Sequence, residues 1–192
     1  ALLVSLVPLG INIAGGALAM RPGDHIAIIG NTYADQLRIH GYLETLLLQR
    51  TQGNPVSIRN LGWGGDTLSI RERPTSFPTE ESVLLAHKTD VIVICFGMGE
   101  SYAGKAGLSD FRSHLERIIA THKGKKYNGE SAVRITLVSP IAHEDHGELS
   151  RNRRQRNKDL AAYVGAMQQV ASAEDVPFVD LYAPTLYLMD DE

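Results

Sequence analysis

The sequence of 192 residues lacks the features that mark several large classes of protein. It contains a single cysteine, Cys95, which excludes an intramolecular disulfide; its apolar neighbours in Val91–Phe96 indicate a small buried side chain rather than a reactive thiol. Basic residues are not in excess, because 19 Lys and Arg stand against 22 Asp and Glu, so no surface for nucleic acid is indicated. With 43% hydrophobic and 21% charged residues, the composition excludes a disordered or fibrous chain and suits one globular domain.

Charge is also absent from the first twenty residues, which are rich in Leu, Val, Ile and Ala. This run ends in Ala17-Leu18-Ala19, a small-x-small pattern that suits a signal-peptidase site. We therefore expect residues 1–19 to be a cleaved export signal, and the mature protein to be periplasmic or extracellular with no stable membrane span. The length also allows an uncleaved anchor. A buried N-terminal helix is disfavoured by the glycines.

Neither end of the chain has the usual marks of a complete protein. No initiating Met and no basic segment precede Ala1, and the chain stops at Asp191-Glu192 without Gly, Pro or a polar tail. We expect the chain to begin inside a longer reading frame and to be cut at its C-terminus, which leaves room for a fused downstream domain.

From residue 20 onward, apolar runs alternate with helical patterns. The runs predict five strands, at 25–30, 56–61, 90–96, 132–138 and 176–181, and the patterns predict helices at 33–50, 108–122 and 153–173. Continuous apolar strands that alternate with helices are typical of βαβ units. We expect an α/β protein, a three-layer α/β/α sandwich with a five-stranded parallel sheet. Its ligand crevice should lie beyond the carboxyl ends of the strands.

The loop after the first predicted strand carries a candidate nucleophile. Thr32, in Gly30-Asn31-Thr32, offers a hydroxyl at a helix N-terminus, where free N–H groups and the helix dipole stabilise an oxyanion. The simpler alternative is that Asn31 or Thr32 only caps the helix.

Two further loops carry candidate oxyanion donors and carboxylates. Gly65 and Gly99 could each offer an N–H, and Asp66 and Glu100 could orient a polar substrate. The alternatives are a tight turn at the first loop and a cap for the next segment at the second.

Two of the seven histidines follow the fourth predicted strand. They lie in His143-Glu144-Asp145-His146, whose spacing does not match zinc-site patterns, so we expect no metal and take His143 as a substrate contact or a loop hydrogen bond. No Gly-rich phosphate loop follows the first strand, which disfavours a nucleotide-binding domain.

Taken together, the loops resemble the blocks of the SGNH (GDSL-type) esterase/acylhydrolase superfamily. The ordered set is Gly30-Asn31-Thr32, Gly65-Asp66-Thr67 and Gly97-Met98-Gly99-Glu100, each after a predicted strand. The chain looks most like an exported branch seen in planctomycete-type bacteria, in which Ser-Pro-Ile-x-His-Glu follows the fourth strand, as in Ser139–Glu144. The resemblance covers residues 20–192. It implies a flavodoxin-like SGNH fold and cofactor-free hydrolysis of a small-molecule or carbohydrate ester by a hydroxyl nucleophile, a histidine base and an aspartate.

The chain departs from that family pattern at four positions. Thr32 stands where the family has its serine, Asn31 replaces an aspartate, and Gly99 stands where the family has an oxyanion asparagine. The Asp-x-x-His block is incomplete, because a histidine three residues after Asp191 would lie beyond the end of the chain. The resemblance assigns catalysis to Thr32 and Asp191 and the oxyanion donors to Thr32 and Gly65. We expect an ester hydrolase with a degenerate site, and keep as the alternative an inactive glycan- or partner-binding domain.

Overall fold

The computed structural model describes residues 13–14, 20–51, 53–144, 147 and 152–190. Helices and strands follow one another along the chain in this order: β1 (Ile13–Ala14), β2 (His25–Gly30), α1 (Thr32–His40), α2 (Tyr42–Arg50), β3 (Ser57–Asn60), α3 (Glu80–Ala86), β4 (Val91–Cys95), the 3-10 helix η1 (Glu100–Gly107), α4 (Leu108–His122), β5 (Arg134–Val138), α5 (Arg153–Ala173), β6 (Phe178–Val179) and α6 (Tyr182–Asp190).

The sheet has the order β1-β6-β5-β4-β2-β3. The five strands from β6 to β3 are parallel, which confirms the predicted architecture. β1 is a sixth, antiparallel strand in which Ile13 and Ala14 pair with Val179 and Phe178. These two residues lie within the predicted export signal, and the predicted cleavage of residues 1–19 stays a prediction.

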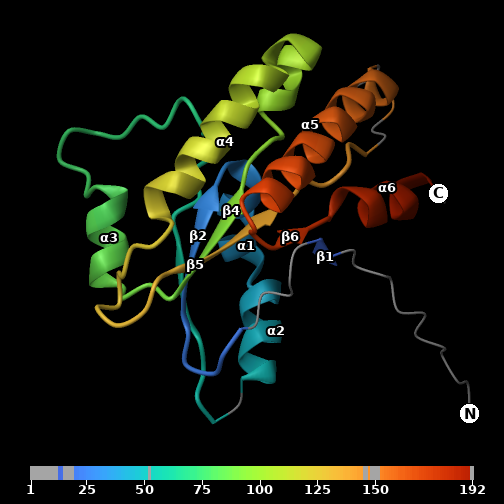
Figure 1. Ribbon diagram of the computed structural model, residues 1–192. Helices are drawn as coiled ribbons and strands as arrows, with labels where there is room; N and C mark the ends of the chain where they lie inside the picture. Colours follow the sequence, from blue (N-terminus) through green and yellow to red (C-terminus); the bar gives the residue numbers. More distant parts are fainter. Residues whose placement is uncertain (1–12, 15–19, 52, 145–146, 148–151, 191–192) are drawn as a thin grey trace, which may run out of the picture.

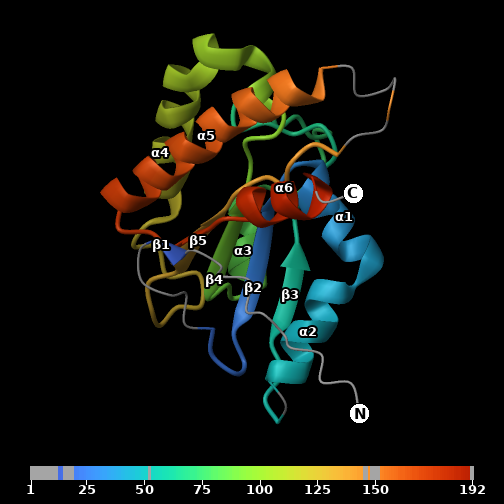
Figure 2. The same cartoon turned by 90° about the vertical axis from the view of Figure 1, so that its right-hand side faces the viewer.

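Helices cover both faces of the sheet, as Figures 1 and 2 show. α4 and α5 lie on one face, and α1 and α2 lie on the other. Apolar residues of the first pair are buried in the larger core: Phe111, Leu115, Ile118 and Ile119 on α4, and Val164, Met167, Val170 and Ala171 on α5. Leu160 of α5 is also fully buried. The central strand β4 is buried, and burial raises the pKa of its Cys95 thiol to about 12, so this thiol is unreactive near neutral pH.

The predicted helix over 33–50 is two helices in the structure. Gly41 adopts a left-handed conformation with φ 66°, ends α1 and lets α2 start in a new direction. As a consequence Leu46 is 56% exposed, while Leu37, Leu43 and Leu47 are half-buried. α3, η1 and α6 were not predicted from the sequence, because each is short or follows closely after a strand.

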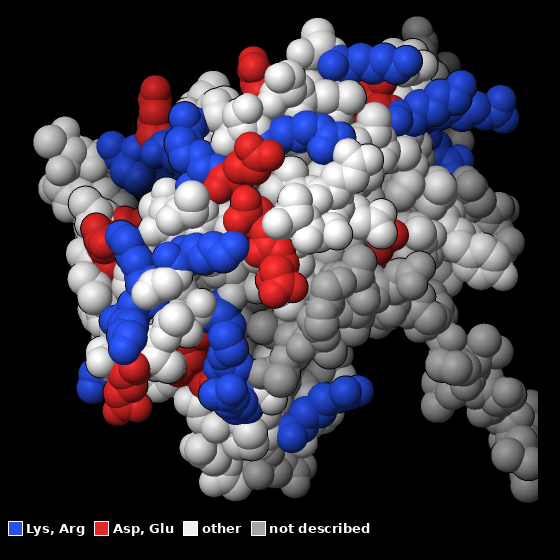
Figure 3. Space-filling model, viewed as in Figure 1, with Lys and Arg blue, Asp and Glu red and all other residues white. Residues whose placement is uncertain are grey.

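Basic and acidic side chains are interspersed over the face of the molecule that Figure 3 shows. Within the part of the chain that the structure describes, no helix combines the length and the apolar character that crossing a bilayer needs.

Candidate active site

A cleft of about 450 Å³ opens at the carboxyl edge of the sheet. It lies where the start of α1 meets the loops that follow β3, β4 and β5, as expected for a parallel α/β sheet. The residues that line it are Asn31, Thr32, Tyr33, Gln36, Gly65, Asp66, Met98, Gly99, Tyr102 and Ile141. The structure thus brings five of the predicted site residues together: Asn31, Thr32, Gly65, Asp66 and Gly99.

Asn31 caps the helix α1, whereas the hydroxyl of its neighbour Thr32 is exposed. Asn31 is buried, and its Oδ1 accepts a hydrogen bond from the Tyr33 N–H at 3.1 Å, so Asn31 is the N-cap of α1. Thr32 is the first residue of the helix and is exposed to the cleft. The cap therefore leaves the Thr32 hydroxyl available for chemistry.

The Thr32 hydroxyl and the predicted oxyanion donor are neighbours. The Gly65 N–H donates a hydrogen bond to Thr32 Oγ1 over 3.2 Å. Gly65 has φ +86°, which side-chain-bearing residues rarely adopt, and no atom of the described residues lies within 4 Å of where its Cβ would stand. A carbonyl carbon attacked by Thr32 would place its oxygen beside this N–H. Among the residues that the structure describes, no histidine or carboxylate bonds to the Thr32 hydroxyl.

The fold does not require a glycine at position 99. Its backbone is right-handed helical, with φ −63° and ψ −43°, and the residue is exposed. A Cβ here would approach one side-chain atom, Thr67 Cγ2, at 3.4 Å, which is close to ordinary van der Waals contact. The structure therefore leaves room for a Cβ at the position where the resemblance predicts an oxyanion asparagine.

The two carboxylates that were predicted to orient a substrate, Asp66 and Glu100, accept hydrogen bonds from other groups of the protein. Asp66, only 6% exposed, accepts hydrogen bonds from Arg73 through both of its oxygens, at 2.9 and 2.5 Å. Glu100 does not line the cleft; its oxygens accept the N–H groups of Leu68 (2.8 Å) and Gly97 (2.9 Å). Asp66 and Glu100 thus hold the loops of the cleft in place, and the predicted substrate contact is not among their interactions.

A chain of charged groups ties this loop to α3 and α4. Arg71 forms an ion pair with Glu80, and its Nε lies 3.9 Å from Oδ2 of Asp66. Glu80 Oε1 lies 3.4 Å from Nε2 of the buried His122, whose Nδ1 is 2.8 Å from the Tyr127 hydroxyl. Burial alone would raise the pKa of Glu80, but His122 and Arg71 outweigh it and hold that pKa below its ordinary value.

We expect Glu80 to contribute to acid denaturation. Because its folded pKa is lowered, its ion pairs stabilise the protein fully above about pH 4.5, and this stabilisation is lost as the pH falls through the folded pKa. In Glu80→Gln the free energy of unfolding should fall less steeply with acid than in the wild type. Urea unfolding at several pH values measures this. The control is Glu81→Gln, at a solvent-exposed pair with Lys125, which should change the slope less. Identical acid slopes for Glu80→Gln and the wild type would contradict the assignment.

His143 lies on the loop after β5 and is not among the residues that line the cleft. Its backbone N–H donates to Asn157 Oδ1 at 2.8 Å, and its carbonyl accepts from Asn157 Nδ2 at 3.1 Å. Its ring makes an edge contact with Tyr102, with the centroids 6.1 Å apart. Burial, together with the charge of Arg156, lowers the His143 pKa and favours the neutral ring. These hydrogen bonds are made by the backbone of His143, whereas its ring contacts Tyr102, which lines the cleft. The role predicted for His143 at the site stays a prediction.

Two further points concern the completeness of the site. Asp191 lies outside the described residues, so its assignment stays a prediction. The described part of the chain contains no group of three or more His, Cys, Asp or Glu that could hold a metal ion. The sequence did not indicate Tyr33, Gln36, Met98, Tyr102 and Ile141 as lining residues. Their position in the segments that follow predicted strands is the signal that could have pointed to them.

A family model agrees with the geometry. The model of the GDSL-like Lipase/Acylhydrolase family matches residues 23–191, which include every loop of the cleft. The chain belongs to the GDSL-like lipase/acylhydrolase family. It is therefore an esterase-type domain, with Thr32 and Gly99 at two positions where the resemblance predicts serine and asparagine. No curated protein is significantly similar to it in sequence.

Solved structures of the same fold include several enzymes. A gut microbial diltiazem-metabolizing enzyme has a TM-score of 0.66 and 18% identity over 93% of this GDSL-like chain and 41% of its own. The chain thus spans about two fifths of that protein's length. The acetyl xylan esterase AlAXEase has a TM-score of 0.60 and 16% identity, over 86% of this chain and 83% of its own. A carbohydrate acetylesterase family member from Sinorhizobium meliloti has a TM-score of 0.57 and 15% identity, over 81% and 82%. At these identities the likeness shows the shared fold.

Proposed function

We propose that this domain hydrolyses esters at the Thr32 cleft, with an acylated carbohydrate or another small ester as substrate. The observation that carries the proposal is the 3.2 Å hydrogen bond between the Gly65 N–H and Thr32 Oγ1 inside a cleft of about 450 Å³. The carbohydrate substrate is supported by the names of two structural neighbours, an acetyl xylan esterase and a carbohydrate acetylesterase family member.

In the proposed mechanism, Thr32 Oγ1 attacks the ester carbonyl while a histidine base takes the hydroxyl proton. The N–H of Thr32, which opens α1 and has no acceptor within the helix, donates to the oxyanion together with the Gly65 N–H. The base returns the proton to the departing alcohol, and water then attacks the acyl-threonine to release the acid and restore the hydroxyl. The resemblance puts the base three residues after Asp191, beyond the given chain.

Acetate release tests this function directly. The full-length protein should release acetate from acetylated xylo-oligosaccharides and should hydrolyse short-chain nitrophenyl esters slowly, since both Thr32 and Gly99 weaken the site. Activity that depends on the Thr32 hydroxyl supports the proposal. Activity that persists unchanged without this hydroxyl contradicts it.

The second candidate function is non-catalytic binding of a glycan or a partner protein. The observation in its favour is that, in the part of the chain described, the Thr32 hydroxyl bonds to the Gly65 N–H and to no base. Glycan binding by the full-length protein, without turnover in any variant of Thr32 or Gly99, would establish this alternative.

We also propose that the protein is exported and loses residues 1–19. The support is the uncharged run that ends in Ala17-Leu18-Ala19. N-terminal sequencing of the mature protein should give a start near Met20. A cytoplasmic product that retains the run would contradict export.

A further inference from the structure

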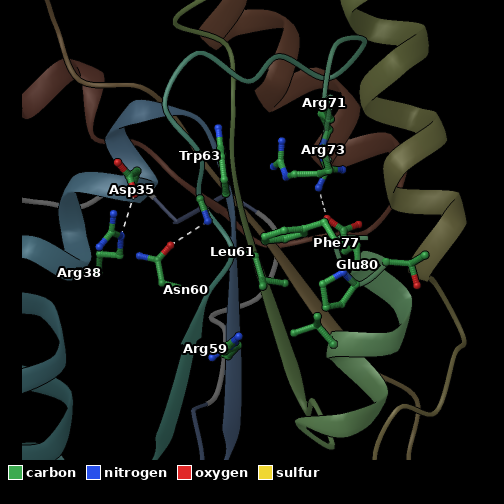
Figure 4. A pocket seen from close by; sticks show the side chains of 14 residues that line it. Asp35, Arg38, Arg59, Asn60, Leu61, Trp63, Arg71, Arg73, Phe77 and Glu80 are labelled. Atoms are coloured by element: carbon green, nitrogen blue, oxygen red, sulfur yellow. Dashed lines mark hydrogen bonds and ion pairs between the residues drawn. The ribbon is translucent and has the colours of Figure 1, made fainter. Parts of the chain in front are cut away.

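A second and larger cleft, of about 580 Å³, lies on the other side of the loop that carries Gly65. It is bounded by α1, the edge strand β3 and the segment that leads into α3, and it shares no lining residue with the Thr32 cleft. Figure 4 shows its walls. Trp63, two residues before Gly65, lines this second cleft, so one short loop borders both cavities.

Two aromatic rings face this cleft. Trp63 and Phe77 are each 44% exposed and meet edge to face, with ring centroids 5.6 Å apart. The guanidinium of Arg73 lies 4.6 Å from the centre of the Trp63 ring and fixes its position. Exposed rings held in a concave site are typical of ligand-binding surfaces, and aromatic rings pack well against the C–H faces of sugars.

Four arginines line the same cleft, and three of them already have a carboxylate partner. Arg38 pairs with Asp35, Arg71 with Glu80, and Arg73 with Asp66. Arg59 differs from the others. It is exposed on β3, and among the described residues it has no carboxylate partner; Figure 4 shows it apart from the ion pairs. A free guanidinium offers a planar pair of donors that matches a carboxylate.

From these contacts we propose that the second cleft binds an acidic sugar, a uronate residue, of the carbohydrate whose ester group enters the Thr32 cleft. The Arg59 guanidinium pairs with the uronate carboxylate, and Trp63 with Phe77 packs against the sugar rings. The substrate is then an acylated acidic polysaccharide that runs across the loop from Trp63 to Gly65. This identification of the substrate rests on the proposed function, whereas binding of the uronate does not.

The test measures binding of ligands that carry no ester. Calorimetric titration compares a xylo-oligosaccharide that bears one glucuronate with the neutral xylo-oligosaccharide of equal length. The wild type should bind the acidic ligand more tightly, and added salt should reduce the difference. Arg59→Gln should weaken binding of the acidic ligand by roughly tenfold or more, as expected for loss of a charge-assisted hydrogen bond, and leave the neutral ligand unchanged. Arg59→Lys should restore part of the affinity.

The control is Arg117→Gln, at an exposed arginine on α4 outside both clefts, which should bind both ligands as the wild type does. Equal affinity of the wild type for both ligands, or Arg59→Gln that binds like Arg117→Gln, would overturn the proposal. Because no ester is hydrolysed in this titration, an inactive Thr32 cleft contradicts the proposed function without affecting the uronate result. The titration repeated with Thr32→Ala should give the same affinities.

Discussion

Thr32→Ala is expected to remove ester hydrolysis, whereas Thr32→Ser should keep or raise it. In a complete triad hydrolase, loss of the nucleophile costs about 10⁶-fold in rate, because only binding and oxyanion stabilisation remain. In the proposed mechanism Gly99 offers no side-chain donor to the oxyanion, so the activity of Thr32→Ala should fall to the background of the assay. The hydroxyl is exposed and bonded to the Gly65 N–H, so its removal should cost little stability.

The serine variant distinguishes the effect of the Thr32 hydroxyl on the rate from the effect of its methyl group. Serine keeps the hydroxyl that accepts the Gly65 hydrogen bond and removes the γ-methyl group, which restricts χ1 and crowds the attacking oxygen. The kcat of the full-length wild type, Thr32→Ser and Thr32→Ala on a short-chain nitrophenyl ester measures both effects, and a thermal melt of each variant controls for folding. Equal kcat in the wild type and Thr32→Ala would rule out Thr32 as the nucleophile.

The fold was largely predictable because its central strands are short, continuous and apolar. A run such as Val91–Cys95 is buried on both faces, and hydrophobic periodicity reports burial directly. The break at Gly41 was not predicted, because a left-handed glycine between two helical patterns leaves the spacing of the leucines almost unchanged. The antiparallel pairing of Ile13–Ala14 was not predicted either, since two residues show no periodicity.

The candidate site was predictable where strand topology decides it. Thr32, Gly65 and Gly99 follow β2, β3 and β4, and parallel strands bring such loops to one edge. Side-chain partners were not predictable in the same way. Glu100 bonds to the Leu68 and Gly97 N–H groups, and His143 packs on Tyr102; both depend on loop paths that periodicity does not encode. The second cleft was missed because its arginines are spread over residues 38–73 and converge only in the folded chain.

Gly99→Asn is expected to raise kcat, by up to about 10²-fold, because loss of one oxyanion donor typically costs about 10²- to 10³-fold in rate. The backbone at Gly99 is already right-handed helical, and among the described residues a new Cβ would approach only Thr67 Cγ2, at 3.4 Å. The new amide would enter the cleft that Thr32 and Gly65 line.

The Gly99→Asn experiment is sharpest in a Thr32→Ser background, where the nucleophile no longer limits the rate. Gly99→Ala is the matched control, since it adds the same Cβ against Thr67 without a hydrogen-bond donor. An oxyanion role requires kcat to rise with asparagine and not with alanine, while the KM changes little, because the donor acts on charge that develops in the transition state. Equal kcat for the asparagine and alanine variants would show that the cleft does not place an oxyanion beside residue 99. The loops after β2 and β3 alone would then form the oxyanion site.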